Sequence, residues 1–182
     1  MPKRVLLITG SPGVGKTTIL TEAVETLEKE GLKVGGMISR EVRANGIRIG
    51  FEIVDLTSSK RGWLAQVSNG NGPQIGKYRV NLEDLEAIGA KSIIEAVGNC
   101  DVVVIDEIGP MELLSWNFRE AVVAALESQG FVLAVVHRKA SDRFLIEVRS
   151  REDAEIFVAT RENREKLVEI ITSKALDYFS HF

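Results

Sequence analysis

The chain has 182 residues, 45% of them hydrophobic and 27% charged, which suits one domain with a single sizeable core. Its net charge is −3 and its pI is near 5.6, so composition gives no strong signal for nucleic acid or anionic membranes. One cysteine, Cys100, excludes an internal disulfide framework, and no apolar run is long enough to span a bilayer. We therefore expect a cytoplasmic protein without membrane contact.

The first elements are a strand and a helix joined by a glycine-rich loop. The run RVLLIT over residues 4–9 is short and continuously apolar, which is typical of a buried parallel strand. After the loop, residues 16–31 show helical spacing and stop at Gly31.

The next segment predicts an antiparallel hairpin. Residues 33–54 hold two alternating stretches around Asn45-Gly46, a pair that favours a hairpin turn because both residues tolerate positive φ. The stretch that follows is rich in Gly, Ser and Asn, so it predicts loops and short strands. We expect a β-rich insert over about 35–80, with the hairpin extending one edge of the sheet.

The rest of the chain alternates helical patterns with apolar runs. The expected helices cover 81–99, 117–130, 141–153 and 161–182, and the expected buried strands cover 100–107, 131–137 and 155–160. This alternation predicts a single α/β domain over 1–182, a three-layer sandwich with a mostly parallel sheet. Ligands of such sheets collect at the carboxyl ends of the strands, so residues directly after each apolar run are candidates for the site.

A phosphate-binding loop follows the first strand. GSPGVGKT fits the pattern G-x-x-x-x-G-K-[ST] in full, and a strand before it and a helix after it favour this interpretation over a mere glycine turn. Its glycines let successive N–H groups point at an anion, and the helix adds the positive end of its dipole. Lys16 is predicted to reach the β- and γ-phosphates, Thr17 to ligate Mg²⁺ and Thr18 to contact the α-phosphate. The predicted nucleotide-binding residues of this loop are Gly10, Ser11, Pro12, Gly13, Val14, Gly15, Lys16, Thr17 and Thr18.

Two carboxylates end the apolar run VVVI. Asp106 is predicted to hold Mg²⁺ beside Thr17, because an acid that ends a buried strand needs a partner. Glu107 is predicted to polarise a water in line with the γ-phosphate, which would make the protein a hydrolase. The alternative is that Glu107 caps or salt-bridges the next loop. Glu112, in the GPMEL that follows, is given a structural role.

The next strand end carries a histidine and then a basic segment. His137 is a candidate for sensing the γ-phosphate or holding the attacking water, and a hydrogen-bonded loop histidine is an equal alternative. An arginine of the basic segment could stabilise transition-state charge, although a solvated helix face is the alternative. Arg138 and Arg143 are expected nearest the strand end, and Arg149 is a further candidate.

The last expected strand leads into a candidate base site. Asn163 is predicted to hydrogen-bond a base edge and Arg164 to stack on the base. Thr160 as a helix N-cap is the structural alternative, and both roles can hold together. Five basic residues of the insert are interpreted as surface charges that protect the edge strand, with a role over the phosphates left open. They are Arg40, Arg43, Arg48, Lys60 and Arg61.

These stretches resemble the THEP-type nucleoside-triphosphatase family, first described from thermophiles, to which a human cancer-related nucleoside triphosphatase also belongs. GSPGVGKTT is generic to P-loop proteins, whereas DEIGPMEL and the T-x-x-N-R near the end are far more specific. Further matching stretches are EVRANGIRIGFEIVDL with the RG at 61–62, GKYRV, VVH and VATRENREKL.

The resemblance implies a Mg²⁺-dependent hydrolase that splits ATP, GTP, CTP and UTP, with a P-loop NTPase fold close to the RecA-like branch. By position it assigns Lys16 and Thr17 to phosphate and metal, Asp106 to the metal and Glu107 to the general base. Arg40 stands where an acid is expected in some relatives, so it takes no role from the family.

Two other functions stay open at this point. A P-loop nucleotide or polynucleotide kinase would use the same loop, with the basic segment 138–151 as a lid over an acceptor. An NTP-dependent switch would act on a protein partner through residues 35–80. Phosphate release to water without an acceptor separates the hydrolase from the kinase.

Overall fold

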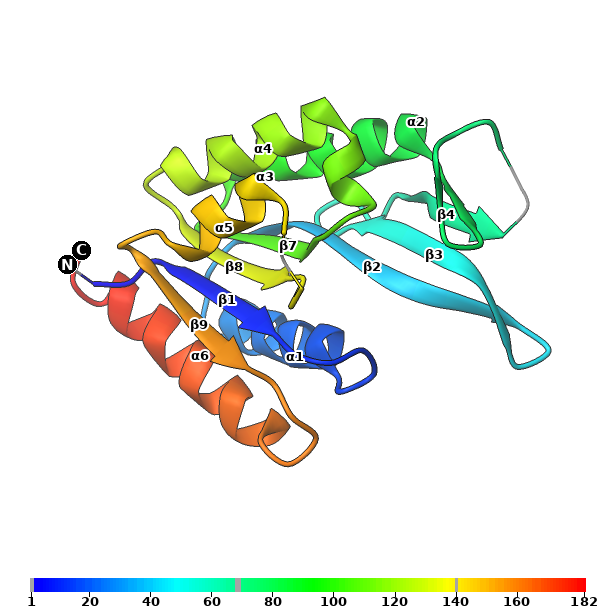
Figure 1. Ribbon diagram of the computed structural model, residues 1–182. Helices are drawn as coiled ribbons and strands as arrows, with labels where there is room; N and C mark the ends of the chain where they lie inside the picture. Colours follow the sequence, from blue (N-terminus) through cyan, green and yellow to red (C-terminus); the bar gives the residue numbers. More distant parts are fainter. Residues whose placement is uncertain (1, 68–69, 140) are drawn as a thin grey trace.

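The computed structural model describes residues 2–67, 70–139 and 141–182, and within them a nine-stranded sheet lies between two layers of helices (Figure 1). The strands are β1 Val5–Thr9, β2 Val34–Ala44, β3 Ile47–Asp55, β4 Arg61–Val67, β5 Gln74–Ile75, β6 Tyr78–Val80, β7 Val102–Ile108, β8 Phe131–Val136 and β9 Ala154–Val158. The helices are α1 Lys16–Lys29, α2 Leu82–Asp84, the π-helix η1 Leu85–Ala90, α3 Lys91–Asn99, the 3-10 helix η2 Glu112–Leu114, α4 Trp116–Glu127, α5 Arg143–Arg149 and α6 Arg164–Phe179.

The order of the strands is β5-β6-β4-β3-β2-β7-β8-β1-β9. The last five strands in this order pair in parallel, as predicted for the core of the sheet. Strand β8 lies between β1, which leads into the glycine-rich loop, and β7, which carries the two acids. This order brings the carboxyl ends of β1, β8 and β7 to one edge of the sheet. The mostly parallel α/β sandwich that was predicted is therefore confirmed, whereas the sequence made no prediction of the strand order.

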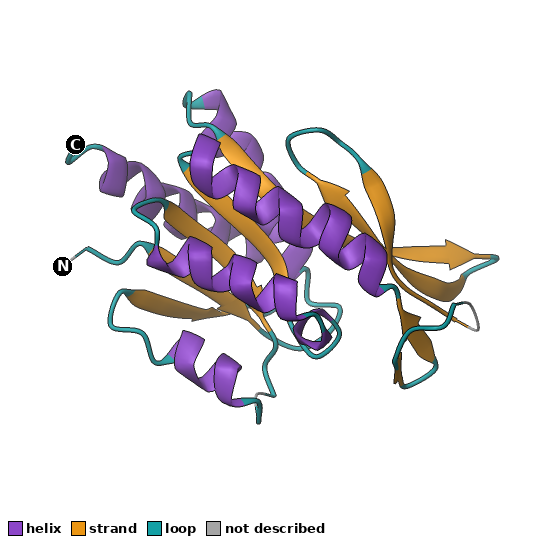
Figure 2. Cartoon of the chain, turned by 90° about the horizontal axis from the view of Figure 1, so that it is seen from above, coloured by secondary structure: helices purple, strands orange, loops and turns teal. Residues whose placement is uncertain are grey.

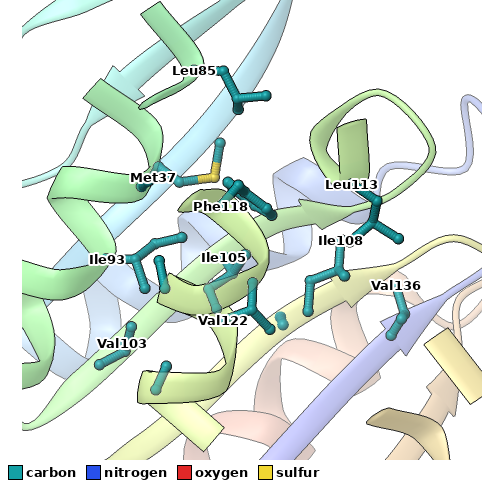
Figure 3. Close-up of a cluster of buried hydrophobic side chains, with 14 of the residues drawn as sticks. Met37, Leu85, Ile93, Val103, Ile105, Ile108, Leu113, Phe118, Val122 and Val136 are labelled. Carbon is teal, nitrogen blue, oxygen red and sulfur yellow. The ribbon is translucent and has the colours of Figure 1, made fainter. Parts of the chain in front are cut away.

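The three central parallel strands, β1, β7 and β8, are buried on both faces. Along β1, Val5 and Leu7 belong to a core cluster with η1, α3, α4 and α5, whereas Leu6 and Ile8 pack with α1 and α6. Figure 3 shows Phe118 and Val122 of α4 within the first cluster. Burial on both faces explains why these strands read as continuous apolar runs rather than alternating ones. In the described part of the chain, every helix is too short or too polar to cross a bilayer.

The predicted hairpin is present and ends where the turn signal lies. Asn45 and Gly46 have φ of 51° and 76° between β2 and β3. The insert continues the sheet through antiparallel β3, β4, β6 and β5, which extend beyond the helical layers (Figure 2). The hairpin is more than an edge, however, because residues 34–37 also pair in parallel with β7. Gly36 permits this approach, since a Cβ there would lie 2.0 Å from the Val104 carbonyl oxygen.

Three expected elements differ from the structure. The helix over 81–99 is divided into α2, η1 and α3, and the helix over 141–153 is reduced to α5. Strand β9 was expected to be buried, but it is the edge strand, with Ile156 42% and Val158 61% exposed. Among the residues that the structure describes, no strand pairs with its outer side, and α5 has only seven residues with which to cover its face. The uncovered face lies beside the glycine-rich loop.

The start of α4 offers a test of local stability. Ser115 is buried, its hydroxyl accepts a hydrogen bond from the Phe118 N–H at 3.1 Å, and it donates to Glu86 at 3.2 Å. We expect Ser115→Ala to lower the free energy of unfolding by about 1 kcal/mol, because it leaves an N–H of the first turn without a partner. Urea unfolding of this variant and of exposed Ser141→Ala measures the difference, and equal midpoints would contradict the capping role.

Candidate functional site

The glycine-rich loop connects β1 to α1 at the carboxyl edge of the sheet. Three of its glycines, Gly10, Gly13 and Gly15, have positive φ, as a loop whose N–H groups curl inward requires. At Gly10 the space is also tight, since a Cβ would lie 2.7 Å from the carbonyl oxygen of Ala159 in the neighbouring chain segment. Because α1 begins at Lys16, its unpaired N–H groups face the same loop.

The side chains of Lys16 and Thr17 contact different partners: Lys16 bonds the loop backbone, and Thr17 bonds Asp106 of β7. The Lys16 ammonium donates to the Gly10 carbonyl oxygen at 2.6 Å and to that of Ser11 at 3.3 Å, so it lies along the loop where phosphates would sit. The Thr17 hydroxyl donates to Oδ2 of Asp106 at 2.7 Å, which joins two predicted metal residues 89 positions apart. Thr18 lies exposed in the first turn of α1.

Asp106 is an unusual acid because it is only 3% exposed. Its pKa is raised from 3.8 to about 7, first by burial and also by the charge of Glu107, against the opposing Thr17 hydrogen bond and Lys16 charge. Burying a carboxylate is costly unless a cation compensates it. The pair Thr17–Asp106 therefore fits a divalent cation.

A metal here would need oxygen atoms from outside the chain. Within residues 2–67, 70–139 and 141–182, no group of three or more His, Cys, Asp and Glu side chains could hold an ion. Mg²⁺ commonly takes one or two protein oxygens and completes its shell with phosphate oxygens and water. The donor set suits Mg²⁺ bound together with a nucleotide, and less well a permanently bound structural metal.

A cavity of about 340 Å³ lies over the glycine-rich loop, and we call it the phosphate cavity. Gly10, Pro12, Gly13, Lys16, Thr17, Ser39, Arg40, Glu41, Arg48, Phe51, Asp106, Glu107, His137 and Arg138 line it. The predicted catalytic residues Lys16, Glu107 and His137 thus face one space. Burial raises the pKa of Glu107, whereas the nearby His137 and Lys16 lower it. The Nδ1 of His137 accepts a hydrogen bond from the Lys139 N–H at 3.3 Å, so the loop interpretation of this histidine also has support.

Glu112 is closer to the site than the sequence suggested. It is 3% exposed, and its pKa is raised well above the usual range, first by burial and then by the charge of Glu107. A Cβ at Gly109 would lie 2.7 Å from Oε1 of Glu107 and 3.1 Å from Oε2 of Glu112. Both carboxylates therefore close over Gly109, which accounts for the glycine in GPMEL. Spacing alone gave no signal that this turn folds Glu112 back.

The basic residues divide into those that reach the loop and those that do not. Nη1 of Arg138 donates to the Ser11 hydroxyl at 2.9 Å, whereas Arg143 pairs with Glu147 and its side chain is 93% exposed. The expectation that Arg143 lies near the strand end is therefore wrong, because it sits on the outer face of α5. Arg149 is half-buried, and its guanidinium donates a hydrogen bond to the His137 carbonyl oxygen at the end of β8.

The insert also contributes charge to the phosphate cavity. Arg40 and Arg48 line it, while Arg43, Lys60 and Arg61 are exposed as predicted for surface charges. Arg48 donates to the Tyr78 hydroxyl at 2.7 Å and to Glu41 at 2.9 Å. The alternation of β2 and β3 around the turn places these two arginines on the cavity, which local composition did not indicate.

The two predicted base-binding residues lie at the start of α6, where Asn163 ends the preceding turn and Arg164 is the first helical residue. The Asn163 side chain accepts from the Thr160 N–H at 2.7 Å and donates to the Val158 carbonyl oxygen at 2.9 Å. It is also the N-cap position of α6, so Thr160 is not the cap, although its hydroxyl accepts from the Asn163 N–H at 3.2 Å. Arg164 lies over Gly15, where a Cβ would come within 2.7 Å of its Cδ. Contact of Asn163 or Arg164 with a base stays a prediction.

The sequence matches the profile of a family described as NTPase over residues 5–172. A nucleoside-triphosphatase THEP1 from Thermofilum pendens is 46% identical over 168 residues, which cover 92% of this chain and 92% of that one. The protein of the same name from Methanosarcina acetivorans is 48% identical over 172 residues, covering 94% of this chain and 96% of its own.

Two solved structures have the same fold over nearly the whole chain. THEP1 from the hyperthermophile Aquifex aeolicus has a TM-score of 0.79 and 31% identity and covers 92% of this chain and 96% of its own. A human cancer-related nucleoside triphosphatase has a TM-score of 0.78 and 36% identity, covering 93% and 96%. The resemblance read from DEIGPMEL and the final T-x-x-N-R is confirmed, and the chain belongs to the NTPase family that includes the THEP1 nucleoside-triphosphatases.

Proposed function

We propose that this chain is a Mg²⁺-dependent nucleoside-triphosphate phosphohydrolase that converts NTP and water to NDP and phosphate. The observation that carries the proposal is the position of Glu107, directly after the predicted metal acid and on the wall of the cavity lined by Lys16 and Thr17. The relatives named nucleoside-triphosphatase support the same reaction. ATP, GTP, CTP and UTP are the proposed substrates, with little base selectivity.

The glycine-rich loop and Lys16 would hold the triphosphate. The loop N–H groups and the start of α1 provide donors, and the ammonium of Lys16 provides positive charge beside the β- and γ-phosphates. When bound at Thr17 and Asp106, Mg²⁺ would neutralise charge on the phosphate oxygens. Arg138, which donates a hydrogen bond to Ser11, lines the same cavity and would add positive charge beside the phosphates.

Glu107 would take a proton from the attacking water. Its pKa is raised by burial, which makes its carboxylate a stronger base than an exposed glutamate. His137 lines the same cavity and would orient that water through its ring. The proposed division of labour is therefore binding by the loop, charge neutralisation by the metal side, and proton transfer by Glu107.

Phosphate release in the absence of any acceptor tests the proposal. We expect release from all four NTPs with Mg²⁺, none with excess EDTA, and at least about tenfold less for Lys16→Ala. A wild-type protein that releases no phosphate from any NTP would contradict the function. Conversion of NTP to NDP that begins only when an alcohol acceptor is added, with the phosphate transferred to that acceptor, would identify a kinase instead.

A cytoplasmic location and the lack of a nucleic-acid partner remain predictions.

A further inference from the structure

A second cavity of about 510 Å³ adjoins the glycine-rich loop on the side of β9, and we call it the β9 cavity. Its walls come from the loop through Ser11 and Val14, from the edge strand through Ile156 and Val158, and from Arg138 and Arg149. It lies on the face of β1 and β9 that the short helix α5 leaves uncovered. Its volume is within the range of small-molecule sites.

The β9 cavity adjoins the phosphate cavity. Gly10 and Arg138 line both spaces, so the two cavities meet at the glycine-rich loop and at Arg138. A ligand whose phosphates occupy the loop can therefore extend a second group past Arg138 toward β9. The phosphate cavity is lined by charged side chains, whereas apolar side chains form part of the wall of the β9 cavity.

The walls of the β9 cavity suit a flat, mostly apolar group. Ile156 and Val158 present β-branched side chains to solvent, 42% and 61% exposed, on a strand that otherwise belongs to a buried sheet. Val14 adds a third apolar side chain from the loop. Binding sites for organic ligands typically combine such surfaces with a few polar groups that fix orientation.

Two polar groups of this kind lack partners. Among the residues that the structure describes, the buried side-chain atoms without a hydrogen bond are Oγ1 of Thr9 and Nε of Arg149, and both residues line the β9 cavity. Thr9 is 9% exposed. A buried polar atom left unpaired costs about 1–3 kcal/mol, so its presence beside a cavity indicates that something else completes the bond.

We propose that the nucleoside half of the NTP occupies the β9 cavity, with its ring against Ile156 and Val158 and its polar groups toward Thr9 and Arg149. This inference rests on the proposed function only in that the triphosphate sits in the glycine-rich loop. An apolar wall accepts the face of any base, and a hydroxyl both donates and accepts. The site would therefore bind all four nucleosides with similar affinity, and Arg164, above Gly15, would lie outside it.

Filling the β9 cavity separates nucleoside binding from phosphate binding. We expect Val158→Trp to raise the Kd for ATP, GTP, CTP and UTP by about tenfold or more while leaving the Kd for inorganic tripolyphosphate unchanged. Val123→Trp, at an exposed valine of α4, is the matched control and is expected to change neither. Titration calorimetry of the full chain with Mg²⁺ measures both ligands.

A second variant guards against a folding defect in the first. Thr9→Val keeps the shape but removes the unpaired hydroxyl, so we expect an unchanged or higher Tm without ligand and weaker binding of all four NTPs. Unchanged NTP affinity in both variants, together with a loss in Arg164→Ala, would overturn the inference and place the base over Gly15. Equal losses for tripolyphosphate would also overturn it. A wild type that binds NTPs without hydrolysing them would contradict the proposed function. The comparison of Kd values among the variants would still decide where the nucleoside binds.

Discussion

Replacing Glu107 with glutamine is expected to lower kcat for NTP hydrolysis by about 10²- to 10⁴-fold, the range that general-base catalysis supplies. Glutamine keeps the size of the side chain and its hydrogen-bonding ability, but it cannot accept a proton from water. The Kd for NTP should change little, because Lys16, Thr17 and the loop N–H groups remain. Single-turnover phosphate release and calorimetric binding measure the two quantities separately.

The matched control makes the same chemical change at an exposed acid. Glu120→Gln, on the outer side of α4, is expected to keep wild-type rates. Full activity in Glu107→Gln would show that this carboxylate serves the loop rather than the water, which is the structural alternative for an acid that closes over Gly109. A loss of NTP binding equal to the loss of rate would assign Glu107 to substrate binding instead.

The parts of the site that could be predicted from the sequence are those set by local pattern and by one general rule. The loop at 10–17 has a fixed spacing, and the hairpin turn at Asn45-Gly46 has a fixed chemistry. The pairing of Thr17 with Asp106 followed because the carboxyl ends of parallel strands meet at one edge of the sheet. None of these required knowledge of which strand lies next to which.

The parts that could not be predicted depend on contacts between distant segments. Strand β9 reads as a buried strand, and only the order of the sheet makes it an edge. The local pattern gave no role to Gly36, which is where the backbone of β2 approaches Val104. Arg138 and Arg143 were both expected near the strand end, but Arg138 in the segment after β8 contacts the loop, whereas Arg143 at the start of α5 faces solvent. The environment of such residues depends on sheet order, strand register and helix length, which local sequence patterns do not specify.

Removing the charge of Asp106 is expected to stabilise the protein when no divalent cation is present. The pKa of this carboxyl is 3.8 in its ordinary state and about 7 in the folded chain, mainly because of burial. A raised pKa means that the folded state holds the proton more tightly than the unfolded state does. The favourable contribution is therefore complete below pH 3.8, and it is lost progressively as the pH rises through about 7.

The loss at pH 8 amounts to roughly 4 kcal/mol at most, since each pKa unit corresponds to about 1.4 kcal/mol. We expect Asp106→Asn to recover part of it, raising the free energy of unfolding at pH 8 in EDTA by on the order of 1–4 kcal/mol. The variant should also lose the decline in stability that the wild type shows between pH 6 and 8. Urea unfolding across this pH range measures both effects, with exposed Asp177→Asn as the control.

Mg²⁺ should reverse the order of the two proteins. A divalent cation at Thr17 and Asp106 compensates the buried charge, so Mg²⁺ with NDP should stabilise the wild type and have far less effect on Asp106→Asn. A wild type that unfolds at the same urea concentration at pH 6 and pH 8 in EDTA would show that Asp106 is not strained by its burial. Equal stabilisation of both proteins by Mg²⁺ and NDP would place the metal elsewhere. Together, these measurements test whether the buried charge of Asp106 lowers the free energy of unfolding without Mg²⁺ and is compensated when Mg²⁺ binds.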